Sequence, residues 1–266
     1  MLKDITIGQY YPADSILHKM DPRTKLMGAV IYVVSLFTFR GIAGFVAVTL
    51  ALMIMIKLSR VPFKFMMKGL KAILAILMIT AAFNLFLTSG ETLVQVWKLR
   101  ITREGLTNAV FMTIRLMYLV LGTSVLTLTT TPNQLTDGME KAWKPLNRIH
   151  VPVHEIAMMM SIALRFIPIL TEETDKIMKA QLARGADFES GNLLKRAKAM
   201  VPILVPLFIS AFRRANDLAM AMEARCYHGG SGRTKMKPLK YKKSDYAAYA
   251  AIGCYMVLIV VLRIKL

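Results

Sequence analysis

Long stretches without a charged side chain alternate with basic segments along this chain. These stretches cover residues 26–39, 41–56, 72–90, 116–136 and 246–262. A helix that crosses a bilayer needs about 17 to 25 mostly apolar residues, so the pattern predicts five membrane-spanning helices. One helix over both of the first two stretches would be about 46 Å long, which is too long for one span. We therefore expect a turn near Arg40 and Gly41, with Lys25 and Lys57 at the outer ends reaching toward the interface.

A different pattern follows the fourth stretch, where apolar residues recur at helical spacing among many charges. It predicts a short helix that ends near Pro145 and a second helix of about 30 residues, kinked at Pro168. A third long helix follows, with Asn192 as its candidate N-cap. Its uncharged run, residues 199–212, is shorter than a membrane span and is typical of a buried or interfacial helix.

These patterns together predict an all-α, polytopic membrane protein. About five transmembrane helices are accompanied by a separate region of about three helices, two of them long. The expected domains are a membrane domain with four helices at residues 1–131, the charged helical region at residues 132–243, and a C-terminal transmembrane helix at residues 244–266.

Composition narrows the class of protein further. The chain has 266 residues, 55% of them hydrophobic, and carries 35 Lys and Arg against 16 Asp and Glu. Nucleic-acid binders and membrane proteins with basic cytoplasmic parts are the two classes that combine these properties. Long apolar stretches are not a feature of nucleic-acid binders. We therefore expect a multi-pass protein of the cell membrane that contacts the lipid bilayer and binds no nucleic acid.

The distribution of basic residues predicts the orientation. Lys and Arg gather before the first stretch and again after the second, between residues 57 and 71, which places both segments in the cytoplasm. The loop at residues 88–104 mixes both charges and is the expected external loop. The N-terminus and the long helical region are therefore predicted to be cytoplasmic. Arg115 fits a side chain that reaches the outer interface.

Groups that could carry catalysis are scarce. The string GGSGRT at residues 229–234 lacks the Lys of a phosphate-binding loop and follows a helical pattern instead of preceding one. His150, His154 and Glu155 have a metal-like spacing without a further ligand nearby, so a solvated helix start is predicted there instead of a metal site. The predicted spans contain no Asp, Glu or His, which disfavours an ion-coupled transporter. We expect a chain that is not an enzyme and binds no cofactor.

A short sequence motif, called the Arg word below, ends both long helical patterns. It reads ARG in AQLARGADFESG, at Ala183, Arg184 and Gly185, and ARC in AMEARCYHGGSG, at Ala224, Arg225 and Cys226. A single Arg at a helix C-terminus is favoured by the helix dipole alone. Two matching words are more specific, because guanidinium groups can bind carboxylates or helix-capping carbonyls in a groove. The repeat therefore favours docking on two similar partner subunits.

Three strings carry a resemblance to a known family. They are SILHKMDPRTKL at residues 15–26, SIALRFIPIL at residues 161–170 and ARGADF at residues 183–188. On these strings the chain resembles the transmembrane T component (EcfT/CbiQ family) of energy-coupling factor (ECF) transporters, which are ABC-type importers of vitamins and metal ions. The resemblance extends over essentially the whole chain.

The resemblance implies a scaffold with several partners. Residues 132–243 would be its coupling domain, and Arg184 and Arg225 would each enter a groove of one of two related ABC ATPase subunits. Those partners, and not this chain, would bind ATP and Mg. A separate membrane-embedded S component, one of several interchangeable ones, would bind the substrate. ARGADF resembles the subgroup with a shared module, which favours vitamins, while dedicated cobalt, nickel or biotin systems stay open.

One departure and two rival functions accompany the resemblance. Cys226 stands where the family pattern has glycine, and is expected either to move the chain reversal onward or to leave a strained turn. A conventional ABC importer permease would hold its own translocation path. A membrane enzyme acting on lipid-linked substrates would need a catalytic cluster, for which Asp14, His18 and Asp21 are the compact candidates. The plain interpretation of Asp21-Pro22 is a helix cap followed by proline in the first turn.

Overall fold

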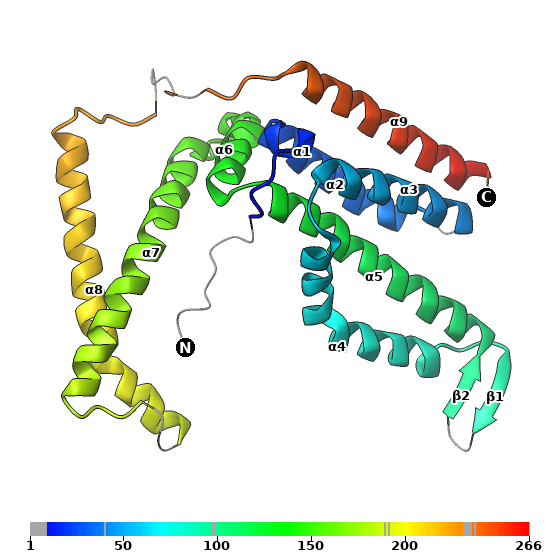
Figure 1. Ribbon diagram of the computed structural model, residues 1–266, viewed down its shortest axis with the longest axis horizontal. Coiled ribbons are helices and arrows are strands. Elements are labelled where there is room, and N and C mark those ends of the chain that lie inside the picture. The colour runs from blue at the N-terminus through cyan, green and yellow to red at the C-terminus, as the bar shows by residue number, and fades with distance from the viewer. Residues whose placement is uncertain are drawn as a thin grey trace. The chain divides into compact units, whose positions relative to one another are not determined.

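The computed structural model describes residues 10–39, 41–96, 99–188, 190, 192–230, 236 and 238–265. Over these residues the chain consists of helices joined by short loops, with one small two-stranded hairpin (Figure 1). It divides into two compact units. The membrane unit comprises Gly8–Gly138 and Leu239–Leu266. The other unit contains Met139–Pro238 and is called the hairpin unit after its pair of long helices, not after the β-hairpin. The predicted helical, polytopic fold is confirmed.

Most helices of the membrane unit coincide with the predicted spans. They are α1 (Ile16–Lys19), α2 (Pro22–Thr38), α3 (Ile42–Ser59), α4 (Phe63–Leu87), α5 (Arg103–Thr129) and α9 (Lys243–Lys265). Among the described residues, α3, α5 and α9 are long and apolar enough to cross a membrane, and α4 qualifies as a pair of segments that differ in direction by 59°. Helix α2, with 17 residues, is slightly shorter. Helices α2 and α3 are separate, as expected, and Arg40 lies outside the described residues.

The core of the membrane unit is formed by residues of α2, α3, α4, α5 and α9. Leu36 and Val48 are fully buried there. Gly122 of α5 lies directly against the ring of Tyr32 on α2, since a Cβ added at Gly122 would lie 2.1 Å from that ring. The Tyr32 hydroxyl donates to the carbonyl of Tyr118 at 2.9 Å. Small residues allow such close helix contacts in membranes, so Gly122 sets the distance between α2 and α5.

The expected external loop contains a short antiparallel hairpin. Strand β1 (Thr92–Val96) pairs with β2 (Leu99–Thr102), with Val96 opposite Leu99. The Thr102 side chain then caps α5 by accepting from the backbone N–H of Gly105 at 3.0 Å. Because of this cap, α5 begins at Arg103, well before the predicted start of the span at residue 116, and it ends at Thr129.

Two basic residues of this unit bind backbone carbonyls at helix ends, and one of them, Lys25, differs from the prediction of a side chain that reaches the interface. Lys25 is buried, and its Nζ donates to the carbonyl of Thr129 at 2.9 Å. That carbonyl lies in the last turn of α5, where the helix leaves C=O groups without intrahelical partners, and the ammonium group satisfies one of them. Arg115 donates to the carbonyl of Phe39 at 3.2 Å, so it joins α5 to the end of α2. Lys57 is exposed as expected.

The second unit is dominated by two helices of equal length. After α6 (Pro132–Trp143) and the 3-10 helix η2 (Lys144–Ile149), α7 (Val153–Ala183) and α8 (Leu193–Glu223) cross each other (Figure 1). Helix α7 continues through Pro168. Asn192 occupies the N-cap position of α8 as predicted, but its side chain makes no capping hydrogen bond. Helix α7 is also apolar enough to pass as a span by length and composition alone.

Candidate functional site

The first Arg word forms the C-terminal cap of α7. The backbone N–H of Ala186 donates to the carbonyl of Gln181 at 3.0 Å, and that of Gly185 donates to the carbonyl of Leu182 at 3.0 Å. Gly185 has a φ of +85°, the left-handed conformation that glycine adopts without a steric penalty. These two bonds with a left-handed residue between them form a Schellman motif, which reverses the chain directly after Arg184.

The second word forms the same motif at the end of α8. The N–H of Tyr227 donates to the carbonyl of Met222 at 3.0 Å, and the N–H of Cys226 donates to that of Glu223 at 2.8 Å. Cys226 takes the place of Gly185 in the motif, with a φ of 54°. Two outcomes were expected at Cys226, a chain reversal that moves onward or a strained turn, and the first does not occur. The turn is kept at Cys226, where a side chain makes the left-handed conformation unfavourable by about 1 kcal/mol.

Both words present their side chains to solvent. All six predicted site residues are exposed: Ala183, Arg184, Gly185, Ala224, Arg225 and Cys226. Within the described part of the chain, neither guanidinium makes a hydrogen bond or ion pair. The two words are not brought together, because α7 and α8 cross in opposite directions and their carboxyl ends point to opposite ends of the pair (Figure 1). The arrangement suits two separate contacts, one at each end.

The two helices are braced near the first word. Arg214 of α8 donates to the carboxylate of Glu173 on α7 at 3.2 Å, and the amide of Gln181 donates to the carbonyl of Pro202 at 3.4 Å. Because Gln181 also accepts the Schellman bond from Ala186, the cap of α7 is joined to the middle of α8. The position of Arg184 is thereby coupled to the packing of the two helices.

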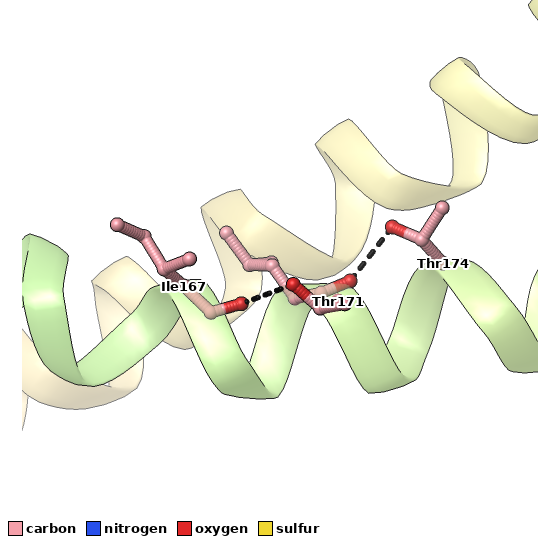
Figure 2. A pocket seen from close by; sticks show the side chains of 4 residues that line it. Ile167, Thr171 and Thr174 are labelled. Carbon is pink, nitrogen blue, oxygen red and sulfur yellow. Dashed lines mark hydrogen bonds between the residues drawn. The ribbon is translucent and has the colours of Figure 1, made fainter. Parts of the chain in front are cut away.

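A hollow of about 260 Å³ on α7 offers no free polar hydrogen to a ligand. Ile167, Leu170, Thr171 and Thr174 line it. Figure 2 shows why its two threonines are not binding groups: the Thr171 hydroxyl donates to the carbonyl of Ile167 at 2.8 Å, and that of Thr174 donates to the carbonyl of Leu170 at 2.7 Å. Both hydroxyl protons are used by their own helix, and the other two lining residues are apolar, so the hollow is a mainly apolar surface.

The segment after the second word returns to the start of α7. Gly230 lies against the ring of His154, where an added Cβ would lie 2.2 Å from the ring. The other side of the ring system is held by Glu140, whose carboxylate lies 3.0 Å from Nδ1 of His154. His154 is therefore part of a packed junction and not the solvated helix start that its sequence suggests. No cluster of metal-ligating side chains occurs among the described residues.

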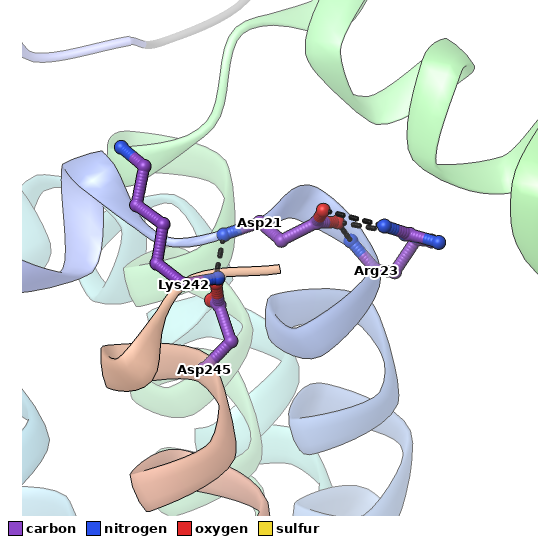
Figure 3. Close-up of polar contacts among 4 residues, drawn as sticks. All are labelled: Asp21, Arg23, Lys242 and Asp245. Atoms are coloured by element: carbon purple, nitrogen blue, oxygen red, sulfur yellow. Dashed lines mark hydrogen bonds and ion pairs between the residues drawn. The ribbon is translucent and has the colours of Figure 1, made fainter. Parts of the chain in front are cut away.

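The string SILHKMDPRTKL builds a polar junction in the membrane unit that sequence reasoning missed. Asp21 is the N-cap of α2, as predicted, and also binds Arg23 at 2.9 and 2.8 Å (Figure 3). The backbone N–H of Asp21 donates to Asp245 at 2.9 Å, and the other oxygen of Asp245 accepts from the N–H of Lys242 at 2.7 Å. Arg23 lies 3.9 Å from the ring centre of Tyr241.

This junction has a defined charge state. Burial raises the pKa of the Asp21 carboxyl, but hydrogen bonds from Arg23 and the charges of Arg23 and Lys25 outweigh it and hold the pKa below its usual range. Asp245 is fully buried and caps the first turn of α9. An Asp ahead of an apolar run is a local signal for such a cap, but nothing local indicates that it also binds the start of α2.

The residues suggested for catalysis are occupied by local contacts. Asp14 pairs with Lys19 at 3.0 Å. His18 lies 2.6 Å from the Ser15 hydroxyl and 2.9 Å from the carbonyl of Tyr11, and Asp21 serves the junction above. Each of these groups stabilises the turn before α2, so the structure does not assemble them into a catalytic cluster.

These features define a class of protein: a polytopic helical membrane protein with a crossed helix pair that ends in two exposed Arg words. Comparison with known proteins identifies its family. A family model described as a cobalt transport protein (CbiQ) matches residues 13–236. The energy-coupling factor transporter transmembrane protein EcfT of Clostridium kluyveri is 58% identical, over 93% of each chain. EcfT of Bacillus subtilis is 46% identical, over 99% of this chain and all of its own.

The chain therefore belongs to the EcfT/CbiQ family, the transmembrane T components of energy-coupling factor transporters. EcfT of Thermosediminibacter oceani, 52% identical over 95% of each chain, has the same description. A T component is a non-catalytic subunit of a transporter. The two rival functions, a conventional permease and an enzyme for lipid-linked substrates, are not retained.

Proposed function

We propose that the chain is the scaffold on which two related ABC ATPase subunits dock, one on Arg184 and one on Arg225. The observation that carries the proposal is the shared cap: both words end their helix in the same Schellman motif and leave an exposed Arg directly before the left-handed residue. A repeated local structure suits two similar grooves. In this scheme ATP and Mg bind to the ATPases, and the crossed helices transmit the movements of the ATPases to the membrane unit.

Family membership supports a proposal for the remaining partners. We propose that a separate S component binds the substrate, with vitamins as the substrate class, and that the N-terminus and the hairpin unit face the cytoplasm. Support for this orientation comes from the basic segments before α2 and between α3 and α4. Purification in mild detergent, followed by identification of the co-purifying membrane proteins, would test whether an S component binds the chain and how many different S components do so.

Charge reversal at the two words tests the docking proposal. The double variant Arg184→Glu/Arg225→Glu should lose the ATPases from an affinity purification of the tagged chain and lose substrate uptake. Lys179→Glu/Arg213→Glu makes the same charge change at exposed positions of the same two helices and should retain both. Normal ATPase recovery and uptake with the first double variant would show that the words are not the docks.

A further inference from the structure

A hollow at one end of α3 combines positive charge with an apolar wall. It has a volume of about 590 Å³ and is formed by α1, the residues just before it, and the last turns of α3. The lining residues are Asp14, Ser15, Ile16, Lys19, Ile54, Lys57, Leu58 and Arg60. All of them belong to the membrane unit, and neither the docking proposal nor the buried junction uses them.

The polar side of the hollow carries a surplus of positive charge. Lys19, Lys57 and Arg60 face a single carboxylate, that of Asp14. Lys19 pairs with this carboxylate at 3.0 Å, and Arg60 donates to the backbone carbonyl of Asp14 at 3.3 Å. Lys57 makes no hydrogen bond or ion pair with any residue that the structure describes. The hollow therefore has cationic donors left for an anion, and a phosphate group accepts such charge-assisted bonds well.

The apolar side continues along the membrane helix. Ile54 and Leu58 line the hollow, and Leu50 and Val46 precede them at intervals of four residues on α3. All four side chains are between 41% and 58% exposed. From Val46 to Leu58 this stripe covers thirteen residues of helix, about 18 Å, which is slightly more than half of a hydrocarbon core of about 30 Å. It therefore has the length of an acyl chain in one leaflet.

We propose that this hollow binds an anionic glycerophospholipid. Lys19, Lys57 and Arg60 hold the phosphate of the headgroup, and an acyl chain follows the stripe from Leu58 to Val46. Basic residues next to a membrane helix attract anionic lipids of the cytoplasmic leaflet. The choice of leaflet rests on the proposed orientation, whereas the binding itself does not depend on it. A free phosphate ion would use the same cations but not the apolar stripe.

Lipid binding to the purified full-length chain tests the proposal. In native mass spectrometry from mild detergent, dioleoyl phosphatidylglycerol should bind more tightly than dioleoyl phosphatidylcholine. The variant Lys57→Gln/Arg60→Gln removes two basic residues and should weaken phosphatidylglycerol binding by about thirtyfold. Lys57→Arg/Arg60→Lys, which keeps both charges, should bind as the unchanged chain does. The matched control Lys64→Gln/Lys68→Gln removes two exposed charges at the start of α4, outside the hollow, and should leave binding unchanged.

Several outcomes would overturn the proposal. Equal binding of the two lipids would show that the hollow has no preference for an anionic headgroup, and an equal loss in the control variant would reduce the effect to general surface charge. Displacement of phosphatidylglycerol by millimolar inorganic phosphate would assign the hollow to a free anion. None of these results bears on the docking of ATPases, because the experiment contains the chain and lipid alone and the varied residues lie in the other unit.

Discussion

The two units hold their helices together in different ways. The membrane unit has fully buried side chains such as Leu36 at its centre, and Lys25 joins α2 to the carbonyl of Thr129 on α5. In the hairpin unit, α7 and α8 are joined by the partly exposed pair Glu173 and Arg214, and most large apolar side chains of α8 stay exposed. Segments with few buried contacts open at low free-energy cost. The difference indicates that the membrane unit is a rigid frame, whereas the helix pair of the other unit can adapt to partners.

The largest effect is expected where the frame is packed most closely. Gly122→Leu would force a side chain into the ring of Tyr32, because even a Cβ lies 2.1 Å from that ring. Overpacking of this kind costs about 3 kcal/mol, and we expect loss of the monodisperse peak in gel filtration. Gly253→Leu is the control, since a Cβ there meets nothing within 4 Å. Equal behaviour of the two variants would contradict the close contact between α2 and α5.

The junction between α2 and α9 should be next in magnitude. Asp245→Ala removes the acceptor for the N–H groups of Asp21 and Lys242 and leaves one buried and one partly buried donor without it. A buried donor without an acceptor costs about 1 to 3 kcal/mol, so the thermal unfolding midpoint in detergent should fall clearly. Ser244→Ala, at the neighbouring position, should change the midpoint little. An unchanged midpoint in Asp245→Ala would show that the junction does not hold the C-terminal helix.

Local features of both units could be predicted from the sequence, and distant pairings could not. The cap at Asp21 and the helix ends at Arg184 depend on neighbouring residues, so short patterns indicate them. The bond between Asp21 and Asp245 joins residues 224 positions apart, and Lys25 lies 104 positions from Thr129. No local pattern states which helices pack together. Lys25 was therefore expected at the interface, although it is buried.

The β-hairpin is a different kind of omission. Thr92–Val96 reads TLVQV, and its Thr and Val residues favour a strand. The signal was present, but it is short and lies between two long helical patterns. The exposure and capping of Arg225 could be predicted in outline, whereas its left-handed neighbour Cys226 could not, because a non-glycine residue in that conformation contradicts its own preference.

The two Arg words allow a smaller, reciprocal test within the hairpin unit. Cys226→Gly should stabilise the end of α8 by about 1 kcal/mol, because glycine adopts the left-handed conformation without the steric cost. Gly185→Ala should destabilise the end of α7 by a similar amount. The amides of Tyr227 and Ala186 donate the 6→1 bonds of the two Schellman motifs. Hydrogen exchange should become slower at Tyr227 in Cys226→Gly and faster at Ala186 in Gly185→Ala. Changes of the same sign in both variants would show that the two caps are not equivalent.

The smallest effect concerns the charge of Asp21 in the frame. Its pKa is held below the usual range, so the folded state favours the carboxylate more than the unfolded chain does. The resulting stabilisation is fully present above the unfolded pKa of about 4 and is lost as pH falls through the lower folded value. Asp21→Asn keeps a helix cap but removes the charge that binds Arg23. The difference in unfolding midpoint between the unchanged chain and this variant should therefore shrink between pH 7 and pH 3.

Asp217→Asn, which removes an exposed carboxylate on α8, controls for the change of one charge. A difference that stays constant over this range would mean that the ion pair of Asp21 and Arg23 contributes nothing to the stability of the frame, and that the junction depends on its uncharged hydrogen bonds alone.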